Sequence, residues 1–181
     1  WDARGRIVRL ARARRAEHDL CLLPGLVDAH VHLGIEPLRG TSPRTFVPWA
    51  AAVMAANGQA GAAERRRRVQ RAAARLLREG TVAFGEIDST GHSLAALHGT
   101  AARGRVYREL TGFHLDAPAS RRLVRERRLP PQGGFATGLS PHAPYSVSPA
   151  LFAAARRASR CLAVHCAETA DEQEFLRRGR G

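Results

Sequence analysis

The sequence predicts an α/β fold, namely part of a (β/α)8 barrel with about five of its eight units. Strand-like and helix-like segments alternate five times along the 181 residues, which is typical of a parallel sheet. An open doubly wound sheet fits the same alternation, but no glycine-rich phosphate-binding loop follows the first strand. A complete barrel needs about 250 residues, so we expect about three units to be missing.

The polar N-terminal residues precede the first barrel strand. Residues 4–10 are expected to form a short strand, and residues 11–20 a charged surface connection. An apolar run follows at residues 22–33, interrupted early by Pro24 and Gly25. Because this run is almost continuously apolar, we predict a strand that is buried on both faces.

The clearest helix is predicted at residues 64–79. Apolar side chains recur there with the spacing of one helix face, at Val69, Ala72, Ala73, Leu76 and Leu77. Gly80 is the expected stop at the C-terminal end of this helix. The arginines between residues 65 and 78 fall mostly on the opposite face, so we interpret them as a solvated surface rather than a phosphate site.

The remaining elements continue the alternation. Strands are predicted at residues 81–87, 106–111, 135–139 (running on to residue 142) and 161–166, and helical segments at residues 93–103, before Pro130 and after Ser148. Ser148 is the expected N-cap of its helix, with Pro149 in the first turn. A last helix is predicted to begin near Thr169.

The net charge of +13 does not by itself indicate a nucleic-acid partner. All 29 basic residues are arginine, which indicates a compositional bias rather than selection for phosphate binding. No finger, homeodomain or RNA-binding pattern is present, so we expect no nucleic acid as partner. No apolar run reaches the ~18 residues of a membrane span, so we expect no membrane partner either. Three cysteines without a CxxC pair indicate a reduced, cytoplasmic protein.

Four of the eight histidines lie at or just past the carboxyl ends of predicted strands, where barrel enzymes place their chemistry. His30 and His32 form an H-x-H pair whose side chains share one face of the first strand, about 7 Å apart. His142 follows the fourth strand, and His165 ends the fifth. A lone histidine of this kind is more often a hydrogen-bonded core residue, but three strand ends carrying histidines together indicate a metal site.

Glu168 follows His165 by three residues, and its spacing allows two interpretations. A carboxylate at the mouth of a metal site can move protons. The same residue fits equally well as an acid in the first turn of a helix, favoured by the helix dipole. A serine-hydrolase elbow of the form G-x-S-x-G is absent from the sequence, which argues against that nucleophile.

Several segments resemble the amidohydrolase superfamily in the right order along the chain. Leu23–Leu33 (Leu-Pro-Gly-Leu-Val-Asp-Ala-His-Val-His-Leu) is similar to its first-strand signature, and Ser140–Ser148 and Leu162–Glu168 to its fourth- and fifth-strand segments. Residues 80–86 and 108–112 also fit. The resemblance implies the N-terminal part of a longer metal-dependent hydrolase, with residues 21–181 in the barrel and residues 1–20 as the remnant of a small β-sandwich. It places a further histidine and aspartate of the site beyond residue 181.

The resemblance also implies roles for individual residues. His30, His32 and His165 match the ligands of one divalent ion, zinc or alternatively iron. Glu168 matches the proton shuttle of the deaminase branch, and His142 a residue close to the substrate and leaving group. The fourth strand contains no lysine, which excludes the lysine-bridged binuclear type.

The function implied is hydrolytic deamination of a small N-heterocyclic substrate, such as an aminated purine nucleoside. The segments resemble deaminases of S-adenosylhomocysteine, aminodeoxyfutalosine and guanine, and triazine chlorohydrolases. Trp49 is a candidate for stacking on a flat ring, or else a core residue. The alternatives are a hydrolase of the same fold with another leaving group, which resembles a chlorohydrolase or a cyclic amidase, and a catalytically incomplete basic binding protein. A homo-oligomer is left open, and the 181 residues alone are expected to be inactive.

Overall fold

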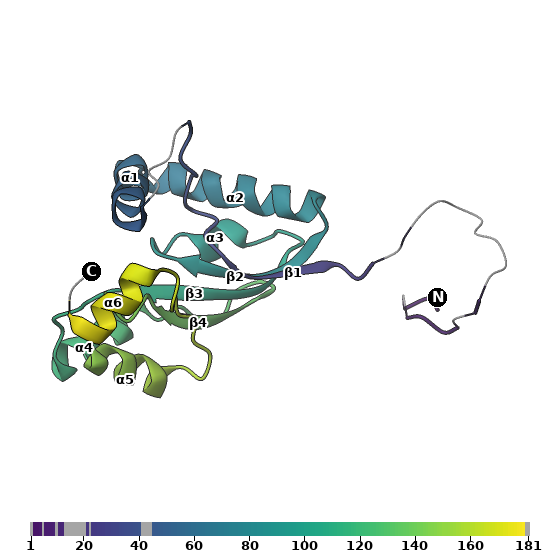
Figure 1. Ribbon diagram of the computed structural model, residues 1–181. Helices are drawn as coiled ribbons and strands as arrows, with labels where there is room; N and C mark the ends of the chain where they lie inside the picture. The colour runs from purple at the N-terminus through teal and green to yellow at the C-terminus, as the bar shows by residue number, and fades with distance from the viewer. Residues whose placement is uncertain are drawn as a thin grey trace.

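Four parallel strands form one sheet in the order β1-β2-β3-β4 (Figure 1). They are β1 (Leu26–Val31), β2 (Thr81–Asp88), β3 (Arg103–Leu110) and β4 (Phe135–Pro141). This computed structural model describes residues 2–4, 6–9, 11–12, 21, 23–40 and 45–179. The strand order follows the chain order without reversal, as in a barrel, whereas a doubly wound sheet reverses at a switch point. The predicted α/β class and partial barrel are thereby confirmed.

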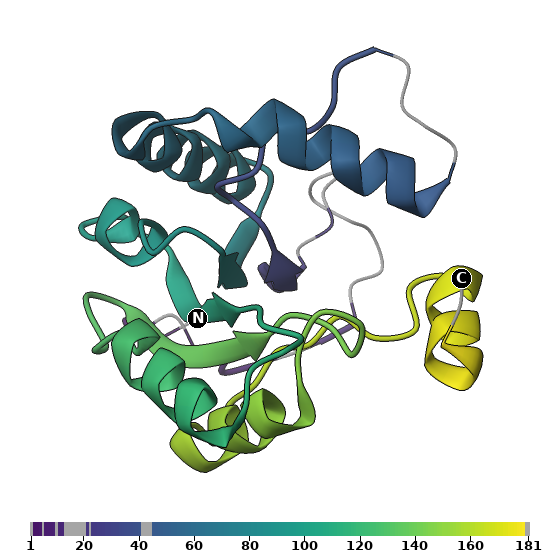
Figure 2. The same cartoon turned by 90° about the vertical axis from the view of Figure 1, so that its left-hand side faces the viewer.

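The helices of the crossovers cover one face of this sheet. They are α2 (Ala62–Arg78), α3 (Ser93–Leu97), α4 (Ala117–Arg127) and α5 (Pro149–Ala158). Figure 2 shows these four helices following one another around the outer side of the strands. Two apolar clusters fill the space between the layers: Val69 and Leu97 pack with Phe84, and Val124 and Leu151 pack with Leu139.

The predicted helix at residues 64–79 is confirmed as α2. Val69 and Ala73 are fully buried, and Gly80 follows the helix with a φ of 93°, a left-handed conformation that favours glycine. The prediction that its arginines are solvated is wrong for Arg68, whose side chain is only 13% exposed. Its guanidinium donates to the side-chain oxygen of Asn57 at 2.6 Å and lies 3.9 Å from the Glu36 carboxylate, in the segment after β1.

Two helices differ from the prediction. The sequence analysis missed α1 (Phe46–Gly58), which is apolar around most of its circumference and so lacks the periodic face that identifies a helix. The predicted helix at residues 93–103 ends at Leu97, because Gly99 adopts a φ of 79° and β3 already begins at Arg103.

The predicted N-cap Ser148 is confirmed, and so is the predicted start of a last helix near Thr169. The Ser148 hydroxyl accepts a hydrogen bond from the Leu151 amide at 3.1 Å, at the start of α5. Thr169 does the same for Glu172 at 3.1 Å, at the start of α6 (Ala170–Arg178). These contacts satisfy amide groups that a helix leaves without partners in its first turn.

The prediction that the first strand is buried on both faces is wrong. Leu26 and Val27 in β1 are 58% and 69% exposed. β1 stands at the end of the strand order and pairs with β2 alone within the described part of the chain. An outer strand has one free edge, and the apolar side chains beside that edge remain in contact with solvent.

The fifth predicted strand, residues 161–166, is not a regular strand. The segment runs beside β4 through one parallel bridge, between Leu139 and Leu162. Leu139 donates to the Cys161 carbonyl at 3.3 Å, and Ala163 donates to the Leu139 carbonyl at 3.1 Å. With few ladder hydrogen bonds the segment stays partly open, and Cys166 is exposed.

The N-terminal prediction is tested only in part. Residues 6–9 form no strand, and residues 13–20 lie outside the described part of the chain. In Figure 1 the described residues near the N-terminus lie away from the sheet. The β-sandwich remnant therefore stays a prediction. Among the described helices, none combines the length and the apolar character needed to cross a membrane.

Candidate metal centre

Three histidines converge at the carboxyl edge of the sheet. His30 and His32 come from the end of β1, and His165 from the segment beside β4; one ring nitrogen of each lies within 4.8 Å of the others. The Nε2 atoms of His32 and His165 are 3.2 Å apart. The ring centroids of His30 and His165 are separated by 4.4 Å. The structure thus brings together the H-x-H pair and the histidine that lies 133 residues further along the chain.

The protonation state of this cluster suits a metal ion. Burial, with the neighbouring His165 as the second cause, lowers the pKa of His32 to about 4. Burial also lowers the pKa of His30, with His165 as the second cause. Neutral imidazoles are the form that binds metal. In addition, the Nδ1 atom of His32 is buried without a hydrogen-bond partner.

The donor set fits a single zinc ion. Zinc prefers nitrogen and sulfur ligands, and catalytic zinc sites use three protein ligands while leaving a further position open. His30, His32 and His165 supply three nitrogens, two of them from a strand whose backbone limits their movement. No lysine occurs in the chain, so a carboxylated lysine cannot bridge a second ion here.

His142 lies beside this trio. Its backbone is fixed on both sides, since its amide donates to the Leu110 carbonyl at 3.0 Å and its carbonyl accepts from the His165 amide at 2.8 Å. Its ring centroid is 5.0 Å from that of His165. The Nδ1 atom lies 2.7 Å from the Ser146 hydroxyl, which holds the ring orientation. Burial lowers the pKa of His142, so this imidazole is neutral as well.

Glu168 contacts the same cluster from the solvent side. Its Oε1 atom lies 2.9 Å from Nδ1 of His165. A carboxylate on the outer nitrogen of a metal ligand orients the imidazole and fixes its tautomer. The alternative of a first-turn helix acid is wrong, because α6 begins at Ala170 and the acids of its first turn are Asp171 and Glu172.

Trp49 stands at the end of a row of aromatic rings that leads to His142. The centroids of Trp49 and Phe46 are 5.9 Å apart, and those of Phe46 and Tyr145 are 6.2 Å apart. Tyr145 in turn lies 5.7 Å from His142. Trp49 is 41% exposed, so the interpretation as a core residue is wrong. The row forms a partly open aromatic wall beside the histidines.

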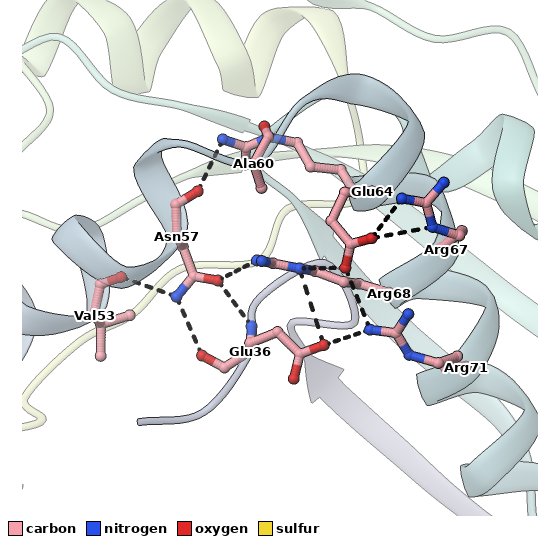
Figure 3. A network of polar contacts seen from close by, with 9 residues as sticks. Glu36, Val53, Asn57, Ala60, Glu64, Arg67, Arg68 and Arg71 are labelled. Atoms are coloured by element: carbon pink, nitrogen blue, oxygen red, sulfur yellow. Dashed lines mark hydrogen bonds and ion pairs between the residues drawn. The ribbon is translucent and has the colours of Figure 1, made fainter. Parts of the chain in front are cut away.

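A polar network holds the segment between the H-x-H pair and α1 (Figure 3). The Asn57 side chain accepts from the Glu36 amide at 2.9 Å and donates to the Glu36 carbonyl at 3.1 Å. Arg68 of α2 donates to the same Asn57 oxygen at 2.6 Å, and Arg71 donates to the Glu36 carboxylate at 2.7 Å. Arg68 thus connects α2 to the helix that carries Trp49, and Arg71 connects α2 to the segment before that helix.

Sequence reasoning missed one carboxylate of the site, Glu109. It precedes the last residue of β3, and one of its oxygens lies within 4.8 Å of nitrogens of His142 and His165. Its Oε1 atom is buried without a partner, and burial raises its pKa. The adjacent Ser140 of β4 is in register with it and also has an unpartnered hydroxyl. An acid at the carboxyl end of a predicted barrel strand was the available signal.

Comparison with known proteins gives one match to a family model. The model of the amidohydrolase family matches residues 21–181. A search of curated proteins found no match.

Solved structures of three enzymes share the fold. Helicobacter pylori aminofutalosine deaminase, in complex with methylthio-coformycin, is 21% identical with a TM-score of 0.75, over 87% of this chain and 40% of that one. An adenosine deaminase from Xanthomonas campestris with bound zinc is 25% identical with a TM-score of 0.65, over 87% and 39%. The zinc complex of atrazine chlorohydrolase from Arthrobacter aurescens is 18% identical with a TM-score of 0.62, over 87% and 44%. The chain thus spans less than half the length of each, and they represent the branch that its segments resemble.

Proposed function

This chain belongs to the amidohydrolase family, and on that premise we propose that it forms the metal-binding half of a hydrolase that deaminates a small N-heterocyclic compound. The observation that carries the proposal is the convergence of three imidazoles, with a carboxylate on one of them, at the carboxyl edge of a barrel sheet. The solved neighbours that act on amino-substituted heterocycles support the same reaction class.

We assign His30, His32 and His165 as the ligands of one zinc ion. Zinc bound there supplies Lewis acidity, which makes a nucleophile available near neutral pH. The lowered pKa values of His30 and His32 keep these imidazoles neutral and ready to bind without first losing a proton. Iron is the alternative ion for the same nitrogen ligands.

Glu168 is assigned the proton transfer. Its carboxylate is solvent-accessible and stands next to the cluster through His165, so it can hold a proton at Oε1 or Oε2 and deliver it to a ring nitrogen of the substrate. Once it has regained a proton from the water oxygen that has added to the ring carbon, the same group can protonate the departing amine, which leaves as ammonia. His142 faces this reaction region as a neutral imidazole, oriented by Ser146.

The aromatic wall gives the substrate its position. Trp49, Phe46 and Tyr145 offer apolar ring faces next to His142, and flat heterocycles stack on such faces. Burial raises the pKa of Tyr145, so its phenol remains a hydrogen-bond donor. We therefore assign a planar, nitrogen-containing ring as the part of the substrate that enters this site.

A second candidate function is release of chloride from a chlorinated heterocycle. The similarity to atrazine chlorohydrolase supports it, because that enzyme has the same fold and binds zinc. The basic binding protein is the contrasting hypothesis, and it requires no metal.

We also propose that the protein is located in the cytoplasm. The three free cysteines fit this reducing compartment.

Metal analysis and product analysis of the natural full-length protein test the proposal. We expect about one zinc per chain by mass spectrometry, loss of zinc in His30→Ala and His32→Ala, and retention in the control His98→Ala, an exposed histidine away from the cluster. Ammonia release from aminated purines supports deamination, whereas chloride release from chlorotriazines supports the second candidate. A full complement of zinc in both H-x-H variants would refute the ligand assignment.

A further inference from the structure

Glu86 of β2 is a buried carboxylate that contacts the backbone next to the H-x-H pair. It is only 1% exposed. Its Oε2 atom accepts a hydrogen bond from the amide of Leu33, the residue after His32, at 2.7 Å. Its Oε1 atom accepts from the Ser93 hydroxyl at 2.7 Å, at the start of α3. One side chain thus links the end of the metal-binding strand to β2 and α3.

The sheet alone holds this end of β1 poorly. The pairing of β1 with β2 is in register at Asp28 and again at Val31, but it shifts between these two residues, where His30 lies. β1 is also the outer strand of the described sheet. An irregular outer strand lacks the continuous ladder that would fix the direction of its side chains. Something beyond the ladder must therefore set the geometry of His30 and His32.

The contact from Glu86 comes at the right place to do so. Val31 is the residue opposite Glu86 in the register, and the Glu86 carboxylate reaches two residues further to the Leu33 amide. The Leu33 side chain is itself buried in the apolar cluster with Val69. Leu33, directly after His32, is therefore held both by its backbone amide and by its own buried side chain.

A second buried acid supports the Ser93 side of this arrangement. Asp88 accepts from the amides of Thr90 at 3.0 Å, Gly91 at 2.7 Å and Ser93 at 3.2 Å. These bonds close the turn between β2 and α3 and bring Ser93 to the Glu86 carboxylate. The order of contacts runs from Asp88 through Ser93 and Glu86 to Leu33.

Burying a carboxylate carries a cost that packing does not require. Among the described residues, no cation forms an ion pair with Glu86, and its partners are one amide and one hydroxyl. An apolar side chain would fill the space between β2 and α3 without the desolvation penalty. Burial raises the pKa of Glu86 to about 8, which reflects this penalty. The Glu86 side chain is therefore better explained by the hydrogen bond that it makes to the Leu33 amide than by a contribution to the stability of the fold.

We propose that Glu86 is a positioning residue, whose hydrogen bond to the Leu33 amide fixes the end of β1 so that His30 and His32 face His165. This inference rests on the proposed function, since it concerns the affinity of the same site for its ion. Partners in the outer shell of a metal site typically change its affinity by 10–100-fold when they are removed.

Zinc binding to the natural full-length protein tests the inference. We expect Glu86→Ala to raise the Kd for zinc, measured by competition with a chromophoric chelator, by about 10–100-fold. The visible spectrum of bound cobalt(II) should change as well, because the ligand geometry changes. Glu86→Gln keeps an acceptor for the Leu33 amide, so its Kd and spectrum should stay close to those of the unaltered protein.

Val124→Ala is the matched control, because it opens a cavity in the other apolar cluster and destabilises the fold without touching Glu86. We expect a lower melting temperature and an unchanged Kd and cobalt spectrum. If Glu86→Ala does not fold, Ser93→Ala replaces it, because it removes one of the two hydrogen bonds to the carboxylate; a weakened Kd is expected there too.

The inference is overturned if Glu86→Ala, or Ser93→Ala in its place, binds zinc as tightly as the unaltered protein. It is also overturned if Glu86→Gln is as weak as Glu86→Ala, or if Val124→Ala weakens zinc equally. An unaltered protein that binds no zinc overturns the proposed function and this inference together, whereas the preceding outcomes leave the proposed function standing.

Discussion

The inner strands and the outer segments of the sheet carry different tasks. β2 and β3 each pair with two neighbours, and their side chains fill the two apolar clusters under the helices. β1, which is largely exposed, and residues 161–166, which are mostly half-buried, pair on one side within the described chain, yet they supply His30, His32 and His165. The stability of the molecule thus lies in its inner strands, and its candidate chemistry at its borders. A site on these outer segments needs contacts beyond strand pairing to fix its residues. The hydrogen bond from the Leu33 amide to the Glu86 carboxylate is one such contact.

The largest effect is expected at the border, on turnover and not on stability. Glu168→Gln keeps an acceptor for His165 but cannot exchange protons, so ammonia release should fall by roughly 10²–10⁴-fold. That loss equals about 3–5 kcal/mol at ~1.4 kcal/mol per decade. Zinc content and melting temperature should stay unchanged. Glu174→Gln in α6 is the matched control, since its side chain is 40% exposed, against 41% for Glu168.

Full turnover in Glu168→Gln would contradict the assignment of proton transfer to Glu168. The carboxylate would then only orient His165. Loss of zinc together with turnover would have the same meaning, because the effect would then pass through His165.

The second prediction compares one residue type in the two regions. Leu110→Ala in β3 removes a fully buried side chain and should cost about 2–5 kcal/mol in the free energy of unfolding. Leu26→Ala in β1 removes a mostly exposed side chain and should cost about 1 kcal/mol or less. Urea unfolding of both variants decides the matter. Equal losses would show that β1 contributes to the core as much as β3 does.

The third prediction uses pH. The pKa of Glu86 is raised from its ordinary 4.5 to about 8 by burial, so the folded chain holds this proton more tightly than the unfolded chain. The contribution of Glu86 to stability is therefore complete at low pH and is lost as the pH rises from about 4.5 to about 8, by at most ~1.4 kcal/mol per pH unit. Glu86→Gln has no such proton, and the difference between the two unfolding curves across this range measures it. Parallel pH dependence in both proteins would contradict the assignment.

The smallest effect compares two helix caps. Ser148→Ala removes the cap of α5 and also the hydrogen bond from its hydroxyl to the Leu115 carbonyl at 2.7 Å, so we expect a loss of about 1–2 kcal/mol. Thr169→Ala removes the cap of α6, which lies apart from the helix-covered face, and should cost about 0.5 kcal/mol in global stability. Hydrogen exchange should show faster exchange confined to α6 in the second variant. Equal global losses would place α6 in the cooperative core.

The inner strands and their helices were predictable because burial makes their pattern periodic. Val69 and Ala73 mark the face of α2, and Ser148 with Pro149 marks the start of α5, in agreement with the structure. The border elements were not predictable in detail. The apolar run of β1 predicts a strand, but it does not show whether a second neighbouring strand buries these side chains.

The site was predictable from motif order and less so from local pattern. The H-x-H pair and His165 stand out because several predicted strand ends carry histidines together, and the structure brings these three histidines into one cluster. Glu109 and Glu86 did not stand out, because a single acid in a strand has no periodic partner. Their roles depend on which strands are neighbours and on burial, and both are properties of the assembled sheet.

The strand order also sets the order in which the molecule can form. Each strand pairs with the next one along the chain, so the sheet can grow from one end as the chain emerges during synthesis. The histidine cluster is the exception, because His32 contacts His165, which is synthesised 133 residues later. We expect the metal centre to be the last part of this region to form. Capture of zinc would then report that every strand between these histidines is already in place.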